Sequence, residues 1–390
     1  MTTRGRLALA LGAVTYLAGW AFGSRPLDVF AVGLLLTVLV AWLAVRLTAR
    51  PVELRRSTQT TPLEGDDLQV RVELELESAL APAGITLVER YTLLGERRTQ
   101  LRREGRHLWA RYVLPAVPRG RYRIEEAFAL VEDPFGLERR RPSLAQGGAL
   151  VVYPRLVGLE QLFSETGTHA RDGRRLLLQR PSGFDLHSVR DYVEGDSLRK
   201  VHWRTTARRG HLMVKELEDS PREDVAVVLD AWRGCSRAVF DVAVRAAGSI
   251  LQAHARRSRR AALVLGGATV EVQRVQAEGD WRRALELLAG AEADGVDSPE
   301  RLLVGERNPA ALALDLVVVT PRLDGSLVDR LVQRAQVRRN TALVYVDGAH
   351  SRQPALVRLQ AAGVAVAVVR EGGDLQRALA APTFAEAAHA

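Results

Sequence analysis

Two long uncharged runs near the start of the chain constrain its fold more than any other feature. Residues 7–24 contain no charge, and neither do residues 29–45. As a helix, each run is just long enough to cross a hydrocarbon core about 30 Å thick. Only Arg25-Pro26-Leu27-Asp28 separates the runs, as a tight polar turn. We therefore predict a transmembrane helical hairpin within residues 1–50. A cleaved signal peptide followed by a single span is the alternative.

The charges beside these runs predict the orientation of the hairpin. The turn carries one arginine and one aspartate, whereas several arginines flank the pair of runs: Arg4, Arg6, Arg46, Arg50, Arg55 and Arg56. Basic flanks favour the cytoplasmic side of a membrane. We therefore expect the hairpin in the cell (plasma) membrane, with the soluble domains in the cytoplasm and the lipid bilayer as one partner.

Composition argues against several classes of protein. The net charge is +9, but acidic residues are interleaved with the basic ones and aromatic residues make up only 5%. A nucleic-acid interface is therefore not expected. Cys235 is the only cysteine, so no disulfide forms within the chain and no Cys/His set is present for structural zinc. We expect no cofactor.

Residues 51–155 show the period of two that is typical of half-buried strands. Apolar and polar residues alternate strictly from Leu68 to Glu77. Shorter runs of the same kind follow, separated by turn signals such as Pro118-Arg119-Gly120, at residues 85–91, 108–114, 122–130 and 149–153. This spacing predicts an antiparallel β-sandwich.

From residue 221 to 381 the pattern changes to apolar strands alternating with helices. We predict strands at residues 225–230, 261–265, 269–275, 314–320, 341–347 and 364–369, the second and third forming a hairpin. Helices are expected at residues 237–256, 280–288, 327–336, 354–361 and 375–380. Continuous apolar strands between helices predict a doubly wound α/β domain. We expect the alanine-rich tail, residues 382–390, to be disordered.

The segment between these domains, residues 156–220, is dense in charged and aromatic residues. Asp196 is placed to N-cap a helix over residues 197–209, with Gly210 after its end. Arg199, Trp203 and Thr206 would share one face of it. A strand over residues 211–217 would follow, with Met213 and Lys215 on one face and Leu212 and Val214 on the other. Lys215 and Lys200 are the only lysines in the chain.

This segment resembles the bacterial family called domain of unknown function 58. The residues that carry the resemblance are Arg190, Tyr192, Gly195, Asp196, Arg199, Val201, Trp203, Thr206, Ala207, Arg208, Leu212, Val214, Lys215 and Glu216, with Arg119-Gly120-x-Tyr122 and Asp133-Pro134-Phe135-Gly136-Leu137 upstream. The resemblance implies a von Willebrand factor A-like C-terminal domain. It also implies partnership with a MoxR-type AAA+ ATPase, and a transglutaminase-like membrane protein is a further candidate partner.

A von Willebrand A domain that binds metal uses Asp-x-Ser-x-Ser after its first strand, but here the loop reads Asp230-Ala231-Trp232-Arg233-Gly234. One carboxylate without the two hydroxyls is a poor magnesium site. We therefore expect a degenerate, metal-free site, in which Asp230 pairs with Arg233 or caps a helix.

The central segment has two interpretations. Asp196 and His202 could perform acid–base work in a hydrolase, although no known catalytic motif accompanies them. Alternatively, Asp196 is only an N-cap, Trp203 packs between domains, and the arginines Arg190, Arg199 and Arg208 pair with Asp191, Glu194 and Glu216. We expect the motif residues to form an interaction surface without catalysis. The expected function is a membrane-anchored adaptor that acts with the ATPase on envelope clients; the hydrolase is the alternative.

Overall fold

The computed structural model describes residues 1–48, 51–58, 61–76, 84–104, 107–144, 149–160, 186–193, 201–217, 225–305, 308–337, 340–348 and 353–380. The chain divides into two compact units, residues 1–155 and 156–390. The expected disorder of residues 382–390 lies outside the described residues.

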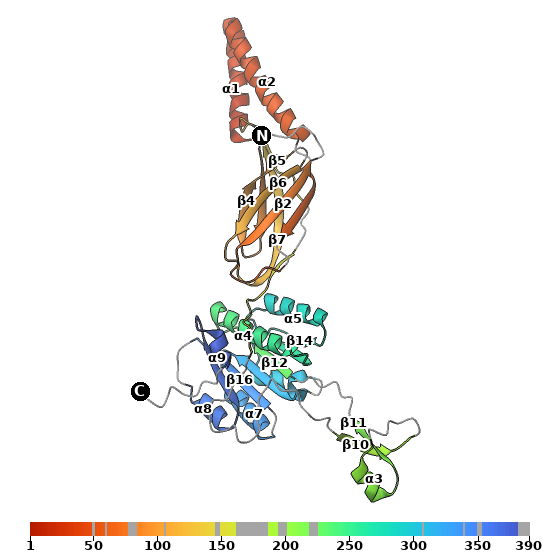
Figure 1. The fold of residues 1–390 in the computed structure, drawn as a ribbon. Coiled ribbons are helices and arrows are strands. Elements are labelled where there is room, and N and C mark those ends of the chain that lie inside the picture. Colours follow the sequence, from red (N-terminus) through yellow and green to blue (C-terminus); the bar gives the residue numbers. More distant parts are fainter. Residues whose placement is uncertain are drawn as a thin grey trace. The chain divides into compact units, whose positions relative to one another are not determined.

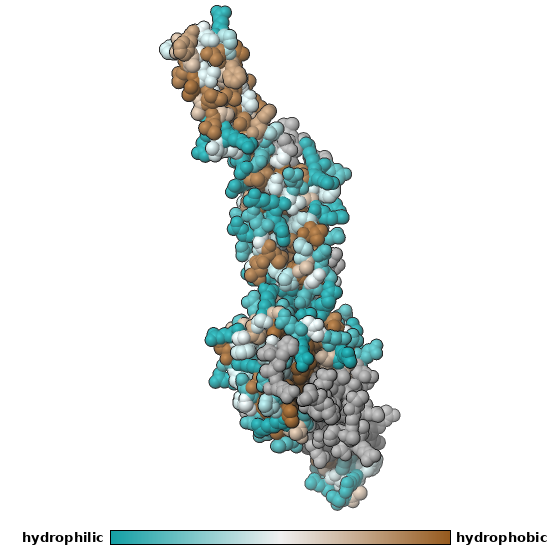
Figure 2. Space-filling view, turned by 90° about the vertical axis from the view of Figure 1, so that its left-hand side faces the viewer, coloured by the Kyte–Doolittle hydropathy of each residue, from teal (hydrophilic) through white to brown (hydrophobic). Residues whose placement is uncertain are grey.

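The first unit begins with two long apolar helices, α1 (Thr3–Phe22) and α2 (Arg25–Thr48). Thr2 caps α1 by accepting a hydrogen bond from the Gly5 backbone N–H at 3.1 Å. Both helices are long and apolar enough to cross a membrane. Their large apolar side chains lie mostly on the surface, as Figure 2 shows at its upper end. The predicted pair of apolar helices is therefore present.

The turn of this hairpin differs from the prediction. Gly23 ends α1 in the left-handed region, with φ of 61°, and only Ser24 separates it from α2. Arg25 and Pro26 belong to the first turn of α2, where the missing N–H of proline costs nothing. The prediction of a turn over residues 25–28 was therefore wrong by one helical turn.

Two antiparallel sheets follow the helices (Figure 1). The first has the strand order β1 (Pro51–Thr58), β2 (Leu68–Leu76), β6 (His107–Leu114), β5 (Arg102–Glu104). The second has the order β4 (Gly95–Gln100), β3 (Gly84–Tyr91), β7 (Gly120–Glu132), β8 (Arg139–Arg140), with β9 (Ala149–Val152) also pairing β7. The alternating residues Leu68, Val70, Val72 and Leu74 are at most 1% exposed, which confirms the strand predicted there.

One apolar core lies between strands of both sheets and includes Val45 from α2. A buried polar network crosses it. Glu89 on β3 accepts hydrogen bonds from Arg56 on β1 and Tyr112 on β6, each at 2.6 Å, and Tyr112 bonds to Tyr91 at the same distance. Burial and the charge of Glu89 raise the pKa of Tyr91 to about 12. The network joins the two sheets through groups that each have a partner.

The second unit contains a six-stranded sheet. Its order is β14 (Val270–Val275), β13 (Ala261–Gly266), β12 (Val225–Asp230), β15 (Asp315–Thr320), β16 (Asn340–Asp347), β17 (Ala365–Arg370). All neighbours are parallel except β13 and β14, which form an antiparallel hairpin. These are the strands predicted from the sequence, and every residue of β12, β13 and β15 is buried.

Helices cover both faces of this sheet. The core on one face includes residues of α4 (Arg237–Ala255), α5 (Glu278–Gly290) and α9 (Leu375–Ala380). The core on the other face includes residues of α7 (Gly325–Gln336), α8 (Pro354–Ala361) and two short elements that were not predicted, η3 (Pro299–Leu303) and α6 (Pro309–Leu312). The chain therefore runs from β12 outward to β14, then returns beside β12 as β15, as in a doubly wound fold.

A small separate motif precedes this sheet in the chain. Strands β10 (Leu186–Asp191) and β11 (Met213–Leu217) pair antiparallel, and helix α3 (Trp203–Arg209) lies between them in sequence. The predicted helix over residues 197–209 was wrong at its start, because Val201 forms a β-bridge with Val214 and His202 is the N-cap. Gly210 ends the helix in the left-handed region, as predicted. The predicted cap by Asp196 lies outside the described residues.

Candidate functional site at the carboxyl end of the sheet

The carboxyl ends of β12 and β15 lie side by side where the order of the sheet reverses. Parallel pairing aligns Leu229 with Val319, so Asp230 and Thr320 end their strands together. From β12 the chain continues toward α4 and then β13 on one side, and from β15 toward α7 and then β16 on the other. Such a reversal is where doubly wound sheets bind their ligands. We therefore take this edge as the candidate functional site.

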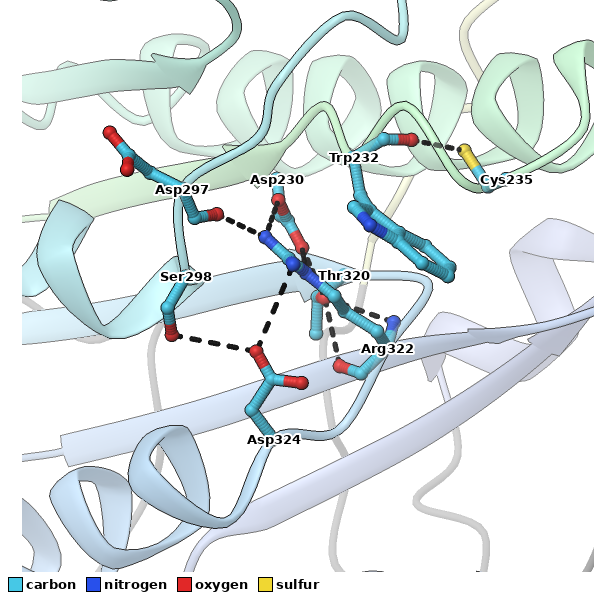
Figure 3. Close-up of polar contacts among 8 residues, drawn as sticks. All are labelled: Asp230, Trp232, Cys235, Asp297, Ser298, Thr320, Arg322 and Asp324. Atoms are coloured by element: carbon cyan, nitrogen blue, oxygen red, sulfur yellow. Dashed lines mark hydrogen bonds and ion pairs between the residues drawn. The ribbon is translucent and has the colours of Figure 1, made fainter.

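Asp230 is the central group of this site (Figure 3). It is 1% exposed. Its Oδ2 accepts hydrogen bonds from Thr320 Oγ1 at 2.8 Å and from Arg322 Nε at 3.0 Å, and its Oδ1 accepts from an Arg322 NH2 at 3.3 Å. The guanidinium therefore donates to both carboxylate oxygens, in the bidentate geometry that arginine favours.

The other contacts of Arg322 hold its guanidinium in place. It donates to the backbone carbonyl of Asp297 and lies 3.9 Å from the carboxylate of Asp324. Its Cζ stands 5.4 Å from the centroid of the Trp232 ring, in a cation–π contact. The Arg322 side chain is 15% exposed, so it closes the site while still reaching solvent.

A close backbone approach brings Asp297 and Ser298 into this cluster. Gly295 donates to the Ala231 carbonyl at 2.8 Å and accepts from the Arg233 N–H at 3.0 Å. A Cβ at Gly295 would lie 2.4 Å from the Gly266 carbonyl oxygen, so glycine is required there. The segment after α5 is thereby tied to the loop after β12, and Ser298 Oγ donates to Asp324 Oδ2 at 3.4 Å.

Burial changes the acid–base properties of the cluster. Burial raises the pKa of the Asp230 carboxyl above its ordinary value, and the hydrogen bonds from Arg322 and Thr320 oppose this only in part. Cys235 is half-buried, and its thiol donates to the Trp232 carbonyl at 3.0 Å. Burial, and then the charge of Asp230, raise the pKa of this thiol. A raised pKa disfavours the thiolate, which is the reactive form of cysteine.

These contacts do not fit a divalent cation at Asp230. Mg²⁺ needs several oxygen ligands in an octahedral array, but both Asp230 oxygens already accept from arginine, and a guanidinium would repel the ion. Within the described ranges, no group of three His, Cys, Asp or Glu residues could hold a metal. The expected pairing of Asp230 with Arg233 was wrong, since Arg322 is the partner. The position of Arg322, two residues after β15, was the sequence signal that could have revealed this partner.

The family motif is described only in part. Gly195, Asp196 and Arg199 lie outside the described residues, and so do the side chains of Lys215 and Glu216. The described strands β10 and β11 are joined by pairing, since the Tyr192 N–H donates to the Leu212 carbonyl at 2.9 Å and Lys215 pairs with Val189. Met213 and Val214, neighbours on β11, are both buried.

The described motif residues have specific local roles. Thr206 Oγ1 accepts from the Met213 N–H at 3.0 Å, which ties α3 to β11. An Arg190 NH1 donates to the Asp191 carbonyl at 3.1 Å, while the Asp191 carboxylate lies 2.9 Å from His211 Nε2. The expected set of arginine ion pairs did not include this histidine. Ala207 and Arg208 belong to α3.

Trp203 and His202 depart most from the sequence predictions. Trp203 is 65% exposed, so the described structure does not show the expected core packing of its ring. His202 Nδ1 accepts from the Thr205 N–H at 3.2 Å and lies 2.7 Å from Thr205 Oγ1. One ring nitrogen of His202 is therefore used to cap a helix.

Together, these features define a protein with two apolar N-terminal helices, antiparallel sheets and a doubly wound α/β sheet that is preceded in the chain by a small motif of β10, α3 and β11. Residues 188–316 match the family described as "Protein of unknown function DUF58". This match, over about a third of the chain, agrees with the resemblance carried by the motif. It is 28% identical over 235 residues to "Uncharacterized protein YeaD" of Bacillus subtilis (strain 168), a match that covers 58% of this chain and 56% of that protein. The match thus spans little more than half of this curated relative.

Proposed function

We propose that this protein is a membrane-anchored adaptor that acts with a MoxR-type AAA+ ATPase in the maturation or assembly of envelope clients. The observation that carries the proposal is the closed cluster at Asp230. At the edge where doubly wound sheets hold ligands, the carboxylate is already satisfied by Arg322 and Thr320. Such an edge offers shape and fixed charge to a partner, whereas general acid–base work needs a group that is free to exchange protons.

The fold supports the finer assignments that accompany this function. Two antiparallel sheets with one apolar core between them are what a β-sandwich requires. A doubly wound sheet with one antiparallel edge hairpin agrees with the von Willebrand factor A-like domain that the family resemblance implies. Domains of this kind with a degenerate metal loop are suited to protein recognition, because their loop edge keeps its position without an ion.

The apolar helices support anchoring in the plasma membrane. Their exposed surface carries Trp20, Phe22, Val29 and Phe30, each at least 62% exposed. In water such a surface is unfavourable, whereas it is the surface that a bilayer requires. The arginine-rich flanks favour a cytoplasmic position for both units. Single-cysteine labelling in whole cells tests this: reagent that cannot cross the membrane should leave the soluble units unlabelled until the cells are lysed.

We assign the ATPase-binding surface to the motif formed by β10, α3 and β11. Trp203 is 65% exposed beside Arg204 and Arg208 on α3. Tryptophan and arginine are frequent anchors of protein interfaces. The docking of this surface on an acidic face of the ATPase would explain why a large aromatic ring stays exposed on a short helix that is rich in arginine.

The experiment is affinity purification of the full chain from native membranes with and without an ATP analogue that traps the ATPase. We expect a MoxR-type ATPase to co-purify in the trapped state. Trp203→Ala should lower its recovery about tenfold, the loss for an interface anchor worth about 1.4 kcal/mol. Val357→Ala, at an equally exposed position on α8, is the matched control and should leave recovery unchanged. Absence of any ATPase in the trapped state would overturn the adaptor proposal.

The alternative of a hydrolase using Asp196 and His202 gains no support from the described residues. Nδ1 of His202 is engaged with Thr205, which leaves only Nε2 for proton transfer. A variant with Asp196→Asn and His202→Ala that keeps its fold and full cellular function would remove this alternative.

A further inference from the structure

One loop of the first unit is fastened to the beginning of α1. Thr2 Oγ1 donates to the Gly136 carbonyl at 2.7 Å, and the Thr2 N–H donates to the Leu137 carbonyl at 3.0 Å. Gly5 packs against the same carbonyl so closely that a Cβ there would lie 2.1 Å from its oxygen. The loop over residues 133–137 therefore lies beside the first turn of α1 and is attached to that helix.

The loop itself is rigid and presents an aromatic ring at its tip. The buried carboxylate of Asp133 accepts from the Phe135 N–H at 2.9 Å and from the Glu138 N–H at 2.6 Å. Gly136 adopts φ of 67°, which completes the turn. Phe135 is nevertheless 67% exposed. The only carboxylate of this turn bonds to the turn's own backbone, while the phenylalanine ring is left exposed. Such an exposed ring indicates a surface that covers it.

The depth of this loop follows from its contact with the helix. The uncharged part of α1 begins at Leu7, two residues after Gly5, which corresponds to about 3 Å along the helix axis. The headgroup region adds roughly 5–8 Å on each side of the hydrocarbon core. A loop at the level of Gly5 would therefore lie inside the headgroup layer, where aromatic rings are favoured.

Several arginines lie around the loop. Arg4, Arg6, Arg46 and Arg140 are exposed at this end of the unit, and the Arg4 guanidinium approaches Gly136. Of the acids on or beside the loop, Glu132 pairs with Arg139, and both Asp133 and Glu138 are buried. Glu75 and Glu104, which both pair with His107, are exposed at the same end of the sheets. Arg46 also stacks on Trp42 near the end of α2, 4.9 Å from the ring centroid. Exposed arginines beside a ring fit the phosphates of anionic lipids.

We propose that the loop over residues 133–137, together with these arginines, is a bilayer-docking surface in which Phe135 enters the interface and the arginines bind the headgroups of anionic phospholipids. The inference rests on the proposed membrane anchoring. It adds that the first unit is held against the bilayer by its own surface, and not only by the two helices. Continuity between α1, α2 and the sheets makes this possible, because Val45 of α2 is 1% exposed within the sheet core.

Spin labels in the full-length protein test the position of the loop. In a Cys235→Ser background, nitroxide labels are placed singly at F135C, V113C and L36C, in nanodiscs that contain phosphatidylglycerol. Val113 is exposed at the end of β6 that pairs with the start of β2, away from the strand ends that follow α2. We expect the label at 135 to collide several-fold more with oxygen, and less with a water-soluble nickel complex, than the label at 113. The label at 36 should be deepest.

The outcomes separate this inference from the membrane proposal. A deep label at 36 with a label at 135 as accessible to water as the label at 113 would overturn the docking surface while the anchor remains. A label at 36 that is accessible to water would overturn both. Lipid selectivity is the second readout: spin-labelled phosphatidylglycerol should associate more strongly than phosphatidylcholine. Arg4→Gln with Arg140→Gln should reduce that preference several-fold, and Arg111→Gln, an exposed arginine on β6, should not. Equal association of both lipids with the unmodified protein would contradict the arginine assignment.

Discussion

A buried carboxylate pairs with an arginine at each end of the six-stranded sheet, and the two pairs differ in how completely the fold encloses them. At the amino end, an Arg259 NH2 lies 2.6 Å from Asp315 Oδ2, and the two side chains are 2% and 6% exposed. At the carboxyl end, the Arg322 and Asp230 side chains are 15% and 2% exposed. The pair at the amino end, called the sealed end below, is thus fully buried. The pair at the carboxyl end, called the rim below, is partly accessible to solvent.

The supporting groups explain this difference. At the amino end, Asp315 also accepts from Asn340 of β16 at 2.8 Å, and His254 of α4 approaches Arg259. Asp315, Asn340 and His254 all belong to a strand or helix, while Arg259 lies two residues before β13. At the carboxyl end, Arg322 lies in a loop and is held by other loops, through Asp297 and Trp232. Regular elements enclose a charge pair more completely than loops do, so the rim is the end that can adapt to a partner.

The largest effect is expected at the sealed end. Arg259→Ala would leave Asp315 buried without its charge partner, which costs about 3–5 kcal/mol of the free energy of unfolding. Urea unfolding of the full chain in detergent, followed by circular dichroism, measures this loss. Arg256→Ala, at an exposed position nearby, should change the free energy by less than about 0.5 kcal/mol. A small loss for Arg259→Ala would show that water reaches this end.

The next effect depends on pH and also concerns the sealed end. Burial, followed by the charges of Arg259 and Arg257, lowers the pKa of His254 to about 3. Below about pH 6.5, His254 therefore binds a proton in the unfolded chain but stays neutral in the folded chain. The contribution of neutral His254 to the free energy of unfolding is complete above about pH 6.5. It falls with acidification, by about 1.4 kcal/mol per pH unit once the pH is well below 6.5.

His254→Asn removes this titration, so its unfolding free energy should fall less steeply than that of the unmodified protein between pH 6.5 and 5. Chemical unfolding at several pH values in this window gives both slopes. Identical slopes would mean that His254 becomes protonated in the folded chain, and hence that the sealed end opens.

A smaller effect is expected at the rim. Arg322→Ala removes the charged hydrogen bonds to Asp230, which contribute about 2 kcal/mol, and admits water to the exposed carboxylate. The loss should be smaller than for Arg259→Ala, measured by the same urea titration. Arg322→Lys keeps the charge without the fork and should recover only part of the loss. Equal losses for Arg259→Ala and Arg322→Ala would erase the distinction between the two ends.

The smallest effect is expected for Thr320→Val, which removes at constant shape the hydroxyl that bonds to Asp230 and to the backbone of Arg322. The cost is about 1 kcal/mol, since Arg322 still satisfies the carboxylate. Thermal unfolding of the full chain is sensitive enough to detect it. A loss as large as that of Arg322→Ala would indicate that the hydroxyl, and not the guanidinium, holds Asp230 in position.

Regular patterns in the sequence predicted most of the fold. The central strands of the six-stranded sheet were found because continuous apolar runs such as Val225–Asp230 are buried on both faces, whereas β10 was not predicted. The edge strands β4 (Gly95–Gln100) and β5 (Arg102–Glu104) were missed, because they are exposed and mostly polar and so carry no alternation of apolar residues. Periodicity reports burial, and elements that bury little are invisible to it.

The candidate site was harder to predict, because its partners are distant in the chain. Asp230 was recognised from its place after an apolar strand, but its partner was sought nearby at Arg233. The actual partner, Arg322, follows a different strand and meets Asp230 only through the parallel pairing of β12 with β15. The start of α3 failed for a similar reason, since the bridge between Val201 and Val214 is a tertiary contact that overrides local helix signals.

The guanidinium at the carboxyl end has a consequence for how the rim responds to its surroundings. A metal ion bound at such an edge is exchangeable, so its occupancy follows the concentration of free ion and can be stripped by chelators. Arg322 is part of the chain and keeps its place beside Asp230 at any ion concentration. The shape of this edge is therefore set when the protein folds, and neither magnesium starvation nor a chelating buffer should alter what it presents.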